Sequence, residues 1–172
     1  MRVLVLDTSA FIMGFEPLGS GDTYTVFRVG DELAQGTMPY LRFRLSKEKG
    51  ALVVREPSEE SKRMVEKASS KTGETGFLSD ADRDVVALAL DLKTEGHEAV
   101  VVSDDYGVQN LSEHLSIGYG SLANFGIAHQ FNWIMVCPAC HRRYKVPEKT
   151  CQVCGTELKR RVLSKKKASR KA

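Results

Sequence analysis

The stretch that decides the fold is RVLVLDTS, residues 2–9. Its apolar run, residues 3–6, is short and unbroken, which is typical of a parallel strand buried on both faces of a sheet. Asp7, Thr8 and Ser9 follow directly and suit a strand end or a helix N-cap. A second stretch has the same form, because the apolar residues 99–102 lead into Ser-Asp-Asp at positions 103–105. We therefore expect two buried strands that each end in acidic residues.

Helix signals lie between and after these strands. A proline at position 57 suits the first turn of a helix, which Gly73 and Gly76 are expected to end. Residues 79–82, Ser-Asp-Ala-Asp, form an N-cap signature in front of the almost wholly apolar segment 85–92. Residues 106–115 predict another short helix. Strands that alternate with helices indicate an α/β fold with a parallel sheet flanked by helices.

Two further expectations concern residues 23–55. Residues 23–35 have apolar side chains at roughly helical spacing and are predicted to be a helix that Gly36 ends. Residues 38–44 and 51–55 resemble two strands joined by the polar turn Ser-Lys-Glu-Lys-Gly at positions 46–50.

All four cysteines lie close together near the C-terminal end of the chain. Cys137 and Cys140 form one C-x₂-C pair, Cys151 and Cys154 form another, and ten residues separate the pairs. This spacing is typical of a structural Zn²⁺ site with four thiolate ligands in a small ribbon. Iron bound by four thiolates, a c-type haem attached at the sequence Cys-Pro-Ala-Cys-His, and redox disulfides are the alternatives.

The charges divide the chain into two unlike parts. Residues 1–136 carry 13 basic and 20 acidic side chains, a net charge of −7, whereas residues 137–172 carry 12 basic and 2 acidic ones, a net charge of +10. We expect a first domain at 1–120, a linker or strand at 121–136, a zinc ribbon at 137–158 and a basic disordered tail at 159–172. Basic side chains of this part are candidate RNA-binding residues, because they can neutralise phosphates. They are Arg142, Arg143, Lys145, Lys159, Arg160 and Arg161.

The acidic residues predict a second metal site. In parallel sheets, ligands bind beyond the carboxyl ends of the strands, where acids from two strand ends and two helices can converge. Burying several carboxylates together is costly unless a cation compensates, and hard oxygen ligands suit Mg²⁺ or Mn²⁺. Taken singly, each acid can equally be a helix cap or a solvated surface group. The candidate catalytic acids are Asp7, Glu32, Asp82, Asp104 and Asp105.

Several classes of protein are disfavoured. No stretch approaches the roughly 18 apolar residues of a membrane span. Asp7 interrupts the apolar start too early for a secretory signal, so a cytoplasmic protein is expected. Phosphate-binding loops, serine hydrolase elbows and zinc protease helices leave recognisable motifs, none of which occurs in the sequence.

The acids and the cysteines together resemble a known family. Residues 5–11, Val-Leu-Asp-Thr-Ser-Ala-Phe, resemble the opening of PIN-domain nucleases, whose later acids are matched by Glu32, Asp82 and the Asp104–Asp105 pair. The PIN resemblance covers roughly the first 120 residues. With the four-cysteine ribbon and the basic end, the whole chain is similar to the archaeal form of the NIN-one-binding protein family. Residues 71–73 and 105–110 also resemble that family.

The resemblance implies a metal-dependent endoribonuclease that cleaves single-stranded precursor RNA at the 3′ end of small-subunit rRNA. Small-subunit pre-rRNA, or the pre-ribosomal particle, would be the partner, and the acids would bind the catalytic Mn²⁺ or Mg²⁺. The wider family often reads Thr/Ser-x-Asp, which selects Asp105, although Asp104 is adjacent. A catalytically silent RNA-binding assembly factor and a toxin-type PIN ribonuclease acting on other RNA are the alternatives.

Overall fold

The computed structural model describes residues 1–17, 21–122 and 129–167. A five-stranded parallel sheet forms the centre of the first part of the chain, in the order β3-β2-β1-β4-β5. The strands are β1 (Arg2–Leu6), β2 (Thr23–Thr25), β3 (Val53–Val54), β4 (Glu98–Val102) and β5 (Gly118–Gly120). Strands β1 and β4 lie side by side in the middle, with Leu6 opposite Val102. The two apolar stretches of the sequence are therefore the two central strands.

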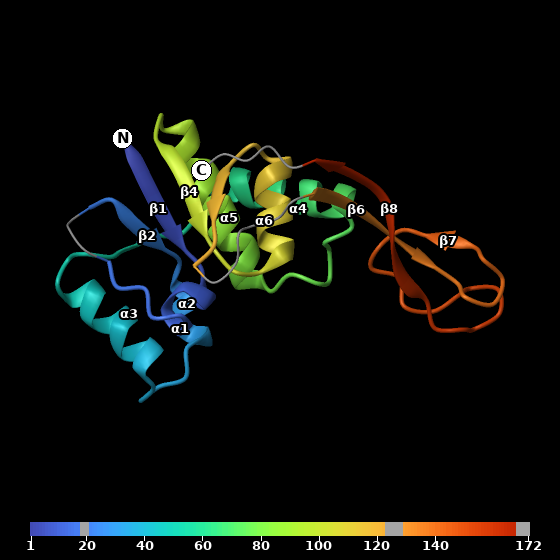
Figure 1. Ribbon diagram of the computed structural model, residues 1–172, viewed down its shortest axis with the longest axis horizontal. Coiled ribbons are helices and arrows are strands. Elements are labelled where there is room, and N and C mark those ends of the chain that lie inside the picture. The colour runs from blue at the N-terminus through green and yellow to red at the C-terminus, as the bar shows by residue number, and fades with distance from the viewer. Residues whose placement is uncertain (18–20, 123–128, 168–172) are drawn as a thin grey trace.

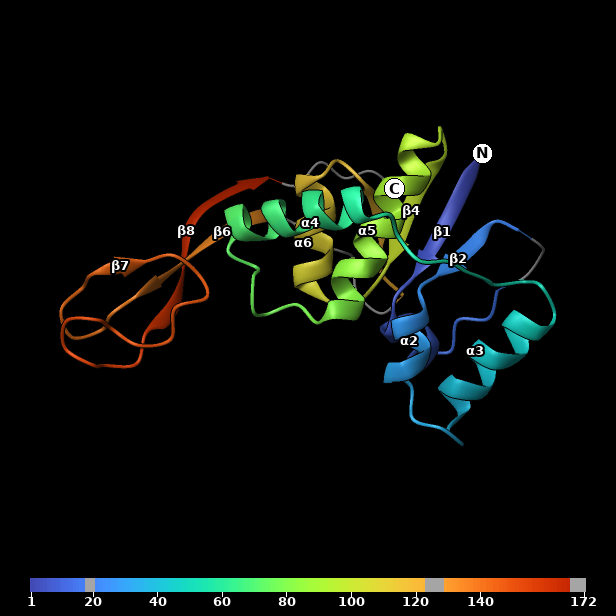
Figure 2. The ribbon, with the colours of Figure 1, turned by 180° about the vertical axis from the view of Figure 1, so that it is seen from behind.

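Six helices accompany the described part of this sheet. They are α1 (Thr8–Ile12), α2 (Phe27–Glu32), α3 (Met38–Glu48), α4 (Glu59–Thr72), α5 (Asp80–Thr94) and α6 (Tyr106–His114). Helix α5 packs against β1, β4, α4 and α6, and residues 84–92 of it are all buried. In Figures 1 and 2, α4, α5 and α6 lie together next to the cysteine-bearing residues 129–167, and α1, α2 and α3 lie at the far end of the molecule. The predicted α/β class, the central helix and the helix at 106–115 are confirmed.

Helix α5 buries two acidic side chains, Asp84 and Asp91, and the second joins α5 to α4. Asp91 is 7% exposed, and its carboxylate accepts hydrogen bonds from the Ser58 backbone NH (2.6 Å), the Ser58 hydroxyl (2.7 Å) and the Ser61 hydroxyl (2.6 Å). Because buried polar groups need partners, these bonds attach the start of α4 to the C-terminal part of α5.

The prediction of a strand at 38–44 is wrong, because this segment is the first part of α3. Pro39 lies in the first turn, where proline favours a helix, and Arg44 pairs with Glu48 one turn on (3.0 Å). Phe43 is the buried contact and packs edge-on against Phe11, with ring centroids 5.7 Å apart. Gly30 admits the Phe43 ring, since a Cβ there would lie 2.7 Å from it. The strand expected at 51–55 is reduced to β3.

The prediction of one helix over residues 23–35 is also wrong in part. Residues 23–25 form β2, which pairs with β1, and only Phe27–Glu32 are helical. The Thr25 hydroxyl donates to the Leu6 carbonyl (2.7 Å), and the spacing of apolar residues in the sequence cannot predict this hydrogen bond. Pairing with the central strand therefore overrides the weak helical spacing.

A second, antiparallel sheet, residues 129–167, carries the cysteines and is called the ribbon below. It projects from the parallel sheet and its helices, which we call the body (Figure 1). Its strands are β6 (His129–Val136), β7 (Arg143–Tyr144) and β8 (Lys159–Lys167), in the order β7-β6-β8. The expectation of a disordered basic tail is corrected for residues 159–167, because they pair with the whole of β6. Residues 168–172 of that tail, and residues 123–128 of the linker or strand expected at 121–136, lie outside the described residues. None of the described helices combines the length and apolar character that crossing a bilayer requires.

Candidate active site and cysteine centre

The carboxyl ends of β1 and β4 bring the first acids together. The Asp7 backbone NH donates to the Val102 carbonyl (3.1 Å), so the parallel pairing of the two strands extends to Asp7. The Asp104 NH donates to the Ser9 hydroxyl (3.1 Å) and the Asp105 NH to the Ser103 hydroxyl (3.1 Å). The two polar segments that follow the central strands therefore hold each other in place.

Asp7 lies at the centre of these bonds and is 3% exposed. One carboxylate oxygen accepts from the Thr8 NH (2.7 Å), which caps α1, and the other accepts from the hydroxyls of Ser9 (3.0 Å) and Ser103 (2.7 Å). Burial is the main cause that raises the pKa of Asp7, and the hydrogen bonds from Ser103, Thr8 and Ser9 only partly oppose it. The negative charge of Asp105 raises this pKa further.

Asp82 faces the same charges from the first turn of α5. Its side chain accepts from the Ser79 NH (2.7 Å) while the Ser79 hydroxyl accepts from the Asp82 NH (3.1 Å), a complete capping box. Burial, followed by the charge of Asp7 and the weaker effect of Asp105, raises the pKa of Asp82 to about 6. Asp7, Asp82 and Asp105 thus form an electrostatically coupled group, which we call the acid cluster.

The adjacent acids Asp104 and Asp105 have different partners. Asp105 caps α6, because one of its oxygens accepts from the backbone NH groups of Gly107 (2.6 Å) and Val108 (3.0 Å). One oxygen of Asp104 instead accepts from the Ser121 hydroxyl and from the Leu122 NH (3.1 Å), beyond the end of β5. Asp104 therefore attaches the segment after β5, whereas the charge of Asp105 acts on Asp7 and Asp82.

Glu32 reaches this region from the last residue of α2. Its carboxylate accepts a hydrogen bond from the Thr8 hydroxyl, and Thr8 follows Asp7 directly. All five predicted acids therefore lie at or beside the same edge of the sheet. Within the described ranges, however, only the cysteines bring three or more metal-ligating side chains within 4.8 Å of one another. The acids are more widely spaced, as mutual repulsion between carboxylates favours, and their hard oxygen donors fit a divalent cation.

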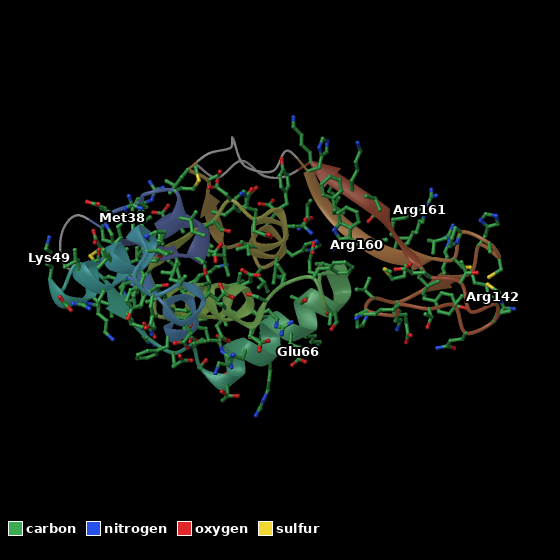
Figure 3. All side chains as sticks on the ribbon, turned by 90° about the horizontal axis from the view of Figure 1, so that it is seen from below. Met38, Lys49, Glu66, Arg142, Arg160 and Arg161 are labelled. Atoms are coloured by element: carbon green, nitrogen blue, oxygen red, sulfur yellow. The ribbon has the colours of Figure 1, made fainter. Side chains whose placement is uncertain are left out.

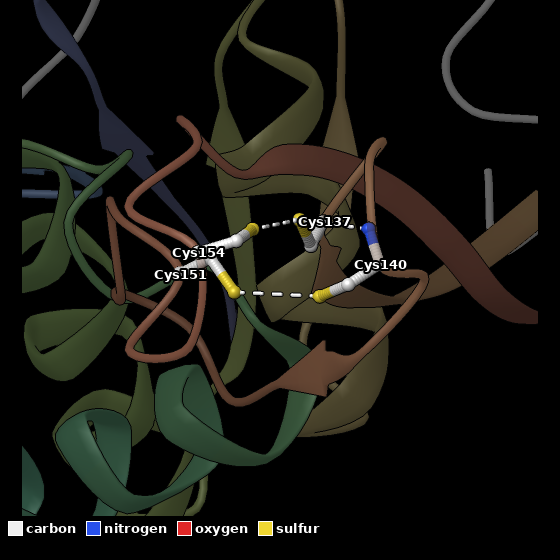
Figure 4. Close-up of side chains that lie close together, drawn as sticks. All are labelled: Cys137, Cys140, Cys151 and Cys154. Carbon is white, nitrogen blue, oxygen red and sulfur yellow. Dashed lines mark hydrogen bonds between the residues drawn. The ribbon is translucent and has the colours of Figure 1, made fainter.

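The four cysteines form the tighter group (Figure 4). The Sγ atoms of Cys137 and Cys154 are 3.5 Å apart, as are those of Cys140 and Cys151. These distances are far longer than a disulfide bond of about 2.05 Å, and the cysteines are free. Four thiolates at about 2.3 Å around one tetrahedral ion would place sulfurs about 3.8 Å apart, so the spacing suits one shared metal.

The two cysteine turns have the same backbone design. The His141 NH donates to the Cys137 carbonyl (3.0 Å), and the Gly155 NH donates to the Cys151 carbonyl (2.9 Å). Both turns end in the left-handed region, with φ 60° at His141 and 70° at Gly155. Glycine adopts this conformation without steric cost, whereas histidine does not.

Side chains of the ribbon also support the sulfurs. The Tyr144 hydroxyl lies 3.1 Å from the Cys151 Sγ atom, and this hydrogen bond is the main cause that lowers the pKa of Cys151 to about 5. The Thr156 hydroxyl lies 3.2 Å from the Cys154 Sγ atom. A lowered thiol pKa favours the thiolate form that binds metal. The Tyr144 hydroxyl is therefore engaged at the cysteine centre.

Most of the predicted RNA-binding side chains are exposed on the ribbon. Arg143, Lys159 and Arg161 line one hollow of about 470 Å³, together with apolar side chains of β6 and β8. Arg142 and Lys145 are exposed as well. Figure 3 shows Arg142 near the outer end of the ribbon and Arg160 nearer the body.

Arg160 is an exception, because its guanidinium is bound within the chain. It donates to the Gly73 carbonyl (2.9 Å) and to the Glu74 carboxylate (2.7 Å), and it lies over the rings of Phe77 (3.9 Å) and Trp133 (4.3 Å). These contacts join β8 to the segment between α4 and α5. We therefore reassign Arg160 from RNA binding to holding the ribbon on the body.

Sequence reasoning missed the polar group that receives Arg160. Glu74 is 2% exposed and also accepts from the Asn110 side chain (2.8 Å) and the Trp133 indole (3.0 Å). Asn110 in turn accepts from the Phe131 NH (2.7 Å) and donates to the Phe131 carbonyl (2.8 Å). The resemblance at residues 71–73 and 105–110 lay next to this group, but no spacing rule points to it.

Comparison with known proteins agrees with this geometry. Residues 4–92 match the family described as the PIN domain of ribonuclease. The chain is 36% identical over 160 residues to endoribonuclease Nob1 of Methanothermobacter thermautotrophicus, covering 91% of each chain. It is 40% identical over 158 residues to endoribonuclease Nob1 of Pyrococcus abyssi, again with 91% of each covered. It is also 34% identical over 169 residues to ribonuclease VapC1 of Thermoplasma acidophilum, covering 98% of this chain and 83% of the relative.

Proposed function

Since the chain belongs to the archaeal Nob1 family of PIN-domain endoribonucleases, we propose that it cleaves single-stranded pre-rRNA at the 3′ end of small-subunit rRNA. The reaction is the hydrolysis of one phosphodiester bond, and its place is the cytoplasm, on the pre-ribosomal particle. One observation carries the proposal: Asp7 is buried at the end of the central strand, and the hydroxyls of Ser9 and Ser103 hold its carboxylate beside the segment that carries Asp105.

The acid cluster would hold Mn²⁺ or Mg²⁺, with Glu32 as a further ligand from α2. When bound, such an ion supplies an activated water and stabilises the departing oxygen. Asp7 is oriented for this task by the Ser9 and Ser103 hydroxyls, which occupy one of its oxygens. Asp82 gains its charge only as the pH rises through about 6, so cation binding should strengthen over the same interval.

Between the two adjacent acids, Asp105 is the better candidate for the cluster. Its charge contributes to the raised pKa values of both Asp7 and Asp82. Asp104 supports the segment after β5 through Ser121 and Leu122. We therefore assign Asp104 a positioning role beside the acid cluster.

The ribbon would anchor the RNA. Zn²⁺ held by the four cysteines would keep the ribbon folded, because so small a sheet has little core of its own. The exposed side chains that could neutralise phosphates are Arg142, Arg143, Lys145, Lys159 and Arg161. Arg143, Lys159 and Arg161 share one hollow, which favours a single path for the RNA backbone across the ribbon.

The test is cleavage of a short RNA that spans the 3′ end of small-subunit rRNA, with and without Mn²⁺. Asp7→Asn should lower the cleavage rate by at least about 100-fold, because several kcal/mol of transition-state stabilisation depend on the metal. RNA binding should stay near normal, since the basic contacts to phosphate are retained. Asp31→Asn, which removes an exposed acid next to Glu32, is the matched control and should cleave normally.

Full cleavage by Asp7→Asn would contradict the nuclease assignment. Faster cleavage of tRNA than of the rRNA junction would contradict the proposed substrate and favour a toxin-type ribonuclease.

A further inference from the structure

A pocket of about 430 Å³ shares a wall with the acid cluster. Asp105 lines one side of it. The other sides are formed by Phe77 from the segment before α5, by Tyr106 from the start of α6, and by Phe131, Trp133 and Arg160 from the ribbon strands. The volume lies within the usual range of small-ligand pockets, about 300–1,000 Å³. Aromatic rings therefore surround a cavity directly beside a proposed metal ligand.

We propose that this pocket binds one unpaired nucleobase of the RNA, from a nucleotide next to the phosphate that is cut. The proposal rests on the nuclease function argued above and adds a substrate subsite to it. A nucleobase presents a flat apolar face of the kind that aromatic side chains stack on, and only a single-stranded nucleotide can turn its base into a side pocket.

Two exposed rings carry the first part of the argument. Phe77 is 50% exposed and Tyr106 is 60% exposed. Both border the pocket, and both come from segments that also hold the acid cluster, because Tyr106 follows Asp105 and Phe77 precedes the cap of α5. Large exposed aromatic side chains at one pocket are typical of a binding surface.

A fixed positive charge holds the aromatic side chains of the pocket in place. The Arg160 guanidinium lies between the rings of Phe77 and Trp133, at 3.9 Å and 4.3 Å, and is fixed by Glu74 and Gly73. A cation on one face of Phe77 holds the ring in place. A base bound here would therefore meet a preformed surface, which lowers the entropic cost of binding.

The close approach of two segments places the pocket beside the acids. A Cβ at Gly107 would lie 2.8 Å from a Leu78 methyl carbon and 3.0 Å from an Asp105 oxygen. Glycine at this position allows the start of α6 to contact the segment before α5. Because the base and phosphate of a nucleotide are covalently linked, a phosphate bound near Asp105 brings its base within reach of Tyr106.

Two of the polar side chains at this pocket, Glu74 and Asn110, are already used by the protein. Glu74 accepts from Asn110, Trp133 and Arg160, and Asn110 exchanges two hydrogen bonds with the Phe131 backbone. Stacking rather than hydrogen bonding should therefore hold the base. It follows that the pocket requires a base but discriminates weakly among the four bases.

The test uses full-length protein carrying Asp7→Asn, so that the RNA stays intact. 2-Aminopurine is placed at each position of the single-stranded RNA in turn, and its fluorescence is followed on binding. We expect strong quenching at one position. Tyr106→Leu and Phe77→Leu should remove the quenching and raise the Kd about 5- to 100-fold, as expected for loss of one stacked base. Tyr106→Phe and Phe77→Tyr keep flat rings and should behave like the parent.

An abasic nucleotide at the responsive position gives an independent measurement. In otherwise unmodified protein it should lower kcat/KM by a similar factor, but by less than about 2-fold when Tyr106→Leu is already present, because the same contact is lost only once. Met64→Ala, which removes an exposed apolar side chain of α4, is the control and should change neither quantity.

Quenching that persists in both leucine variants, or no quenching at any position, would overturn the pocket while cleavage by the unmodified protein upholds the nuclease. If the unmodified protein does not cleave the RNA but the quenching is intact, the nuclease function is contradicted and the pocket is upheld. A change of more than about 10-fold in Kd when the base at that position is exchanged would overturn the stacking mode.

Discussion

The four cysteines lie between residues 137 and 154, whereas the acid cluster is assembled from residues 7, 82 and 105. In the ribbon, two short turns with the same backbone hydrogen bonds direct the sulfurs to one point. In the body, Asp7 and Asp105 cap α1 and α6, and Asp82 belongs to the capping box of α5. The pairing of β1 with β4 places Asp7 and Asp105 at the same edge of the sheet. The arrangement of the cysteines thus depends on local turn geometry, and the acid cluster depends on the folded sheet.

This difference predicts that loss of the zinc proposed for the ribbon unfolds the ribbon but not the parallel sheet. Removal of zinc, or Cys151→Ser, should unfold residues 137–158 and leave the parallel sheet intact, because metal binding supplies about 10–16 kcal/mol to small zinc modules. Hydrogen exchange read separately for β1 and β4 and for β7 and the cysteine turns would measure this. Gln152→Ala, an exposed residue of the same turn, is the control. Loss of protection in β1 would show that the two regions are not independent.

The acid cluster should respond to single carboxylates in a graded way. Asp105→Asn is expected to lower the cleavage rate about 100-fold or more, because it removes a charge that acts on both Asp7 and Asp82. Asp104→Asn should cost about 10-fold or less, since the amide oxygen can still accept from Ser121 and Leu122. The comparison of the two rates at saturating Mn²⁺ measures this. The reverse order would assign the metal to Asp104.

The pH dependence of stability should reveal the cluster without any RNA. The pKa of Asp82 is about 6 in the folded chain and 3.8 for an ordinary aspartate, so the folded state keeps a proton that the unfolded state loses. Stability therefore falls as the pH rises from about 4 to about 6. Asp82→Asn removes this loss and keeps an acceptor for the Ser79 NH.

Without divalent ions, Asp82→Asn should match the parent at pH 4 and melt about 2–4 °C higher at pH 8. This shift corresponds to about 1 kcal/mol after allowing for the screening of a partly exposed group. Added Mn²⁺ should make the parent melt at the higher temperature at pH 8, because only the parent keeps all the carboxylates that would bind the ion. Equal melting temperatures across this range would contradict the coupling of the acids.

An effect of similar size tests the local design of the cysteine turns. His141 has φ 60°, where Gly155 stands at the matching position of the other turn. His141→Gly should stabilise the zinc-bound ribbon by about 1 kcal/mol, because a left-handed backbone strains a residue with a Cβ. Competition for zinc with a chelator measures the gain, and Gly155→Ala should give the opposite sign. A weaker hold on zinc in His141→Gly would show that the side chain matters more than the backbone.

Much of the fold could be predicted from residues 1–17 and 79–115, and less from residues 23–55. The two central strands and α5 are continuous apolar segments with clear caps, so their local signals agree with the tertiary structure. Strand β2 is the sequence Thr-Tyr-Thr and is extended because it pairs with β1. The sequence predicts a strand in place of the first part of α3, because the buried face of this helix is reduced largely to Phe43 and its periodic signal is weak.

The basic end shows the same limit. Residues 159–167 have the composition of a disordered tail, yet they form β8, because β6 offers a complete strand to pair with. Arg160 looked like one of several phosphate-binding side chains until the structure placed Glu74, Phe77 and Trp133 around it. Composition reports the average charge of a segment and not the partner of a particular side chain.

The amino-acid sequence alone predicted the cysteine centre, the two central strands and five candidate acids, because each strand, cysteine turn and helix cap has a signal within a short stretch of residues. Only the tertiary structure decided which acids are coupled, that Arg160 holds the ribbon on the body, and that Phe77 and Tyr106 border a pocket beside Asp105. These depend on how strands and helices distant in sequence pack, and no local pattern of residues records that packing.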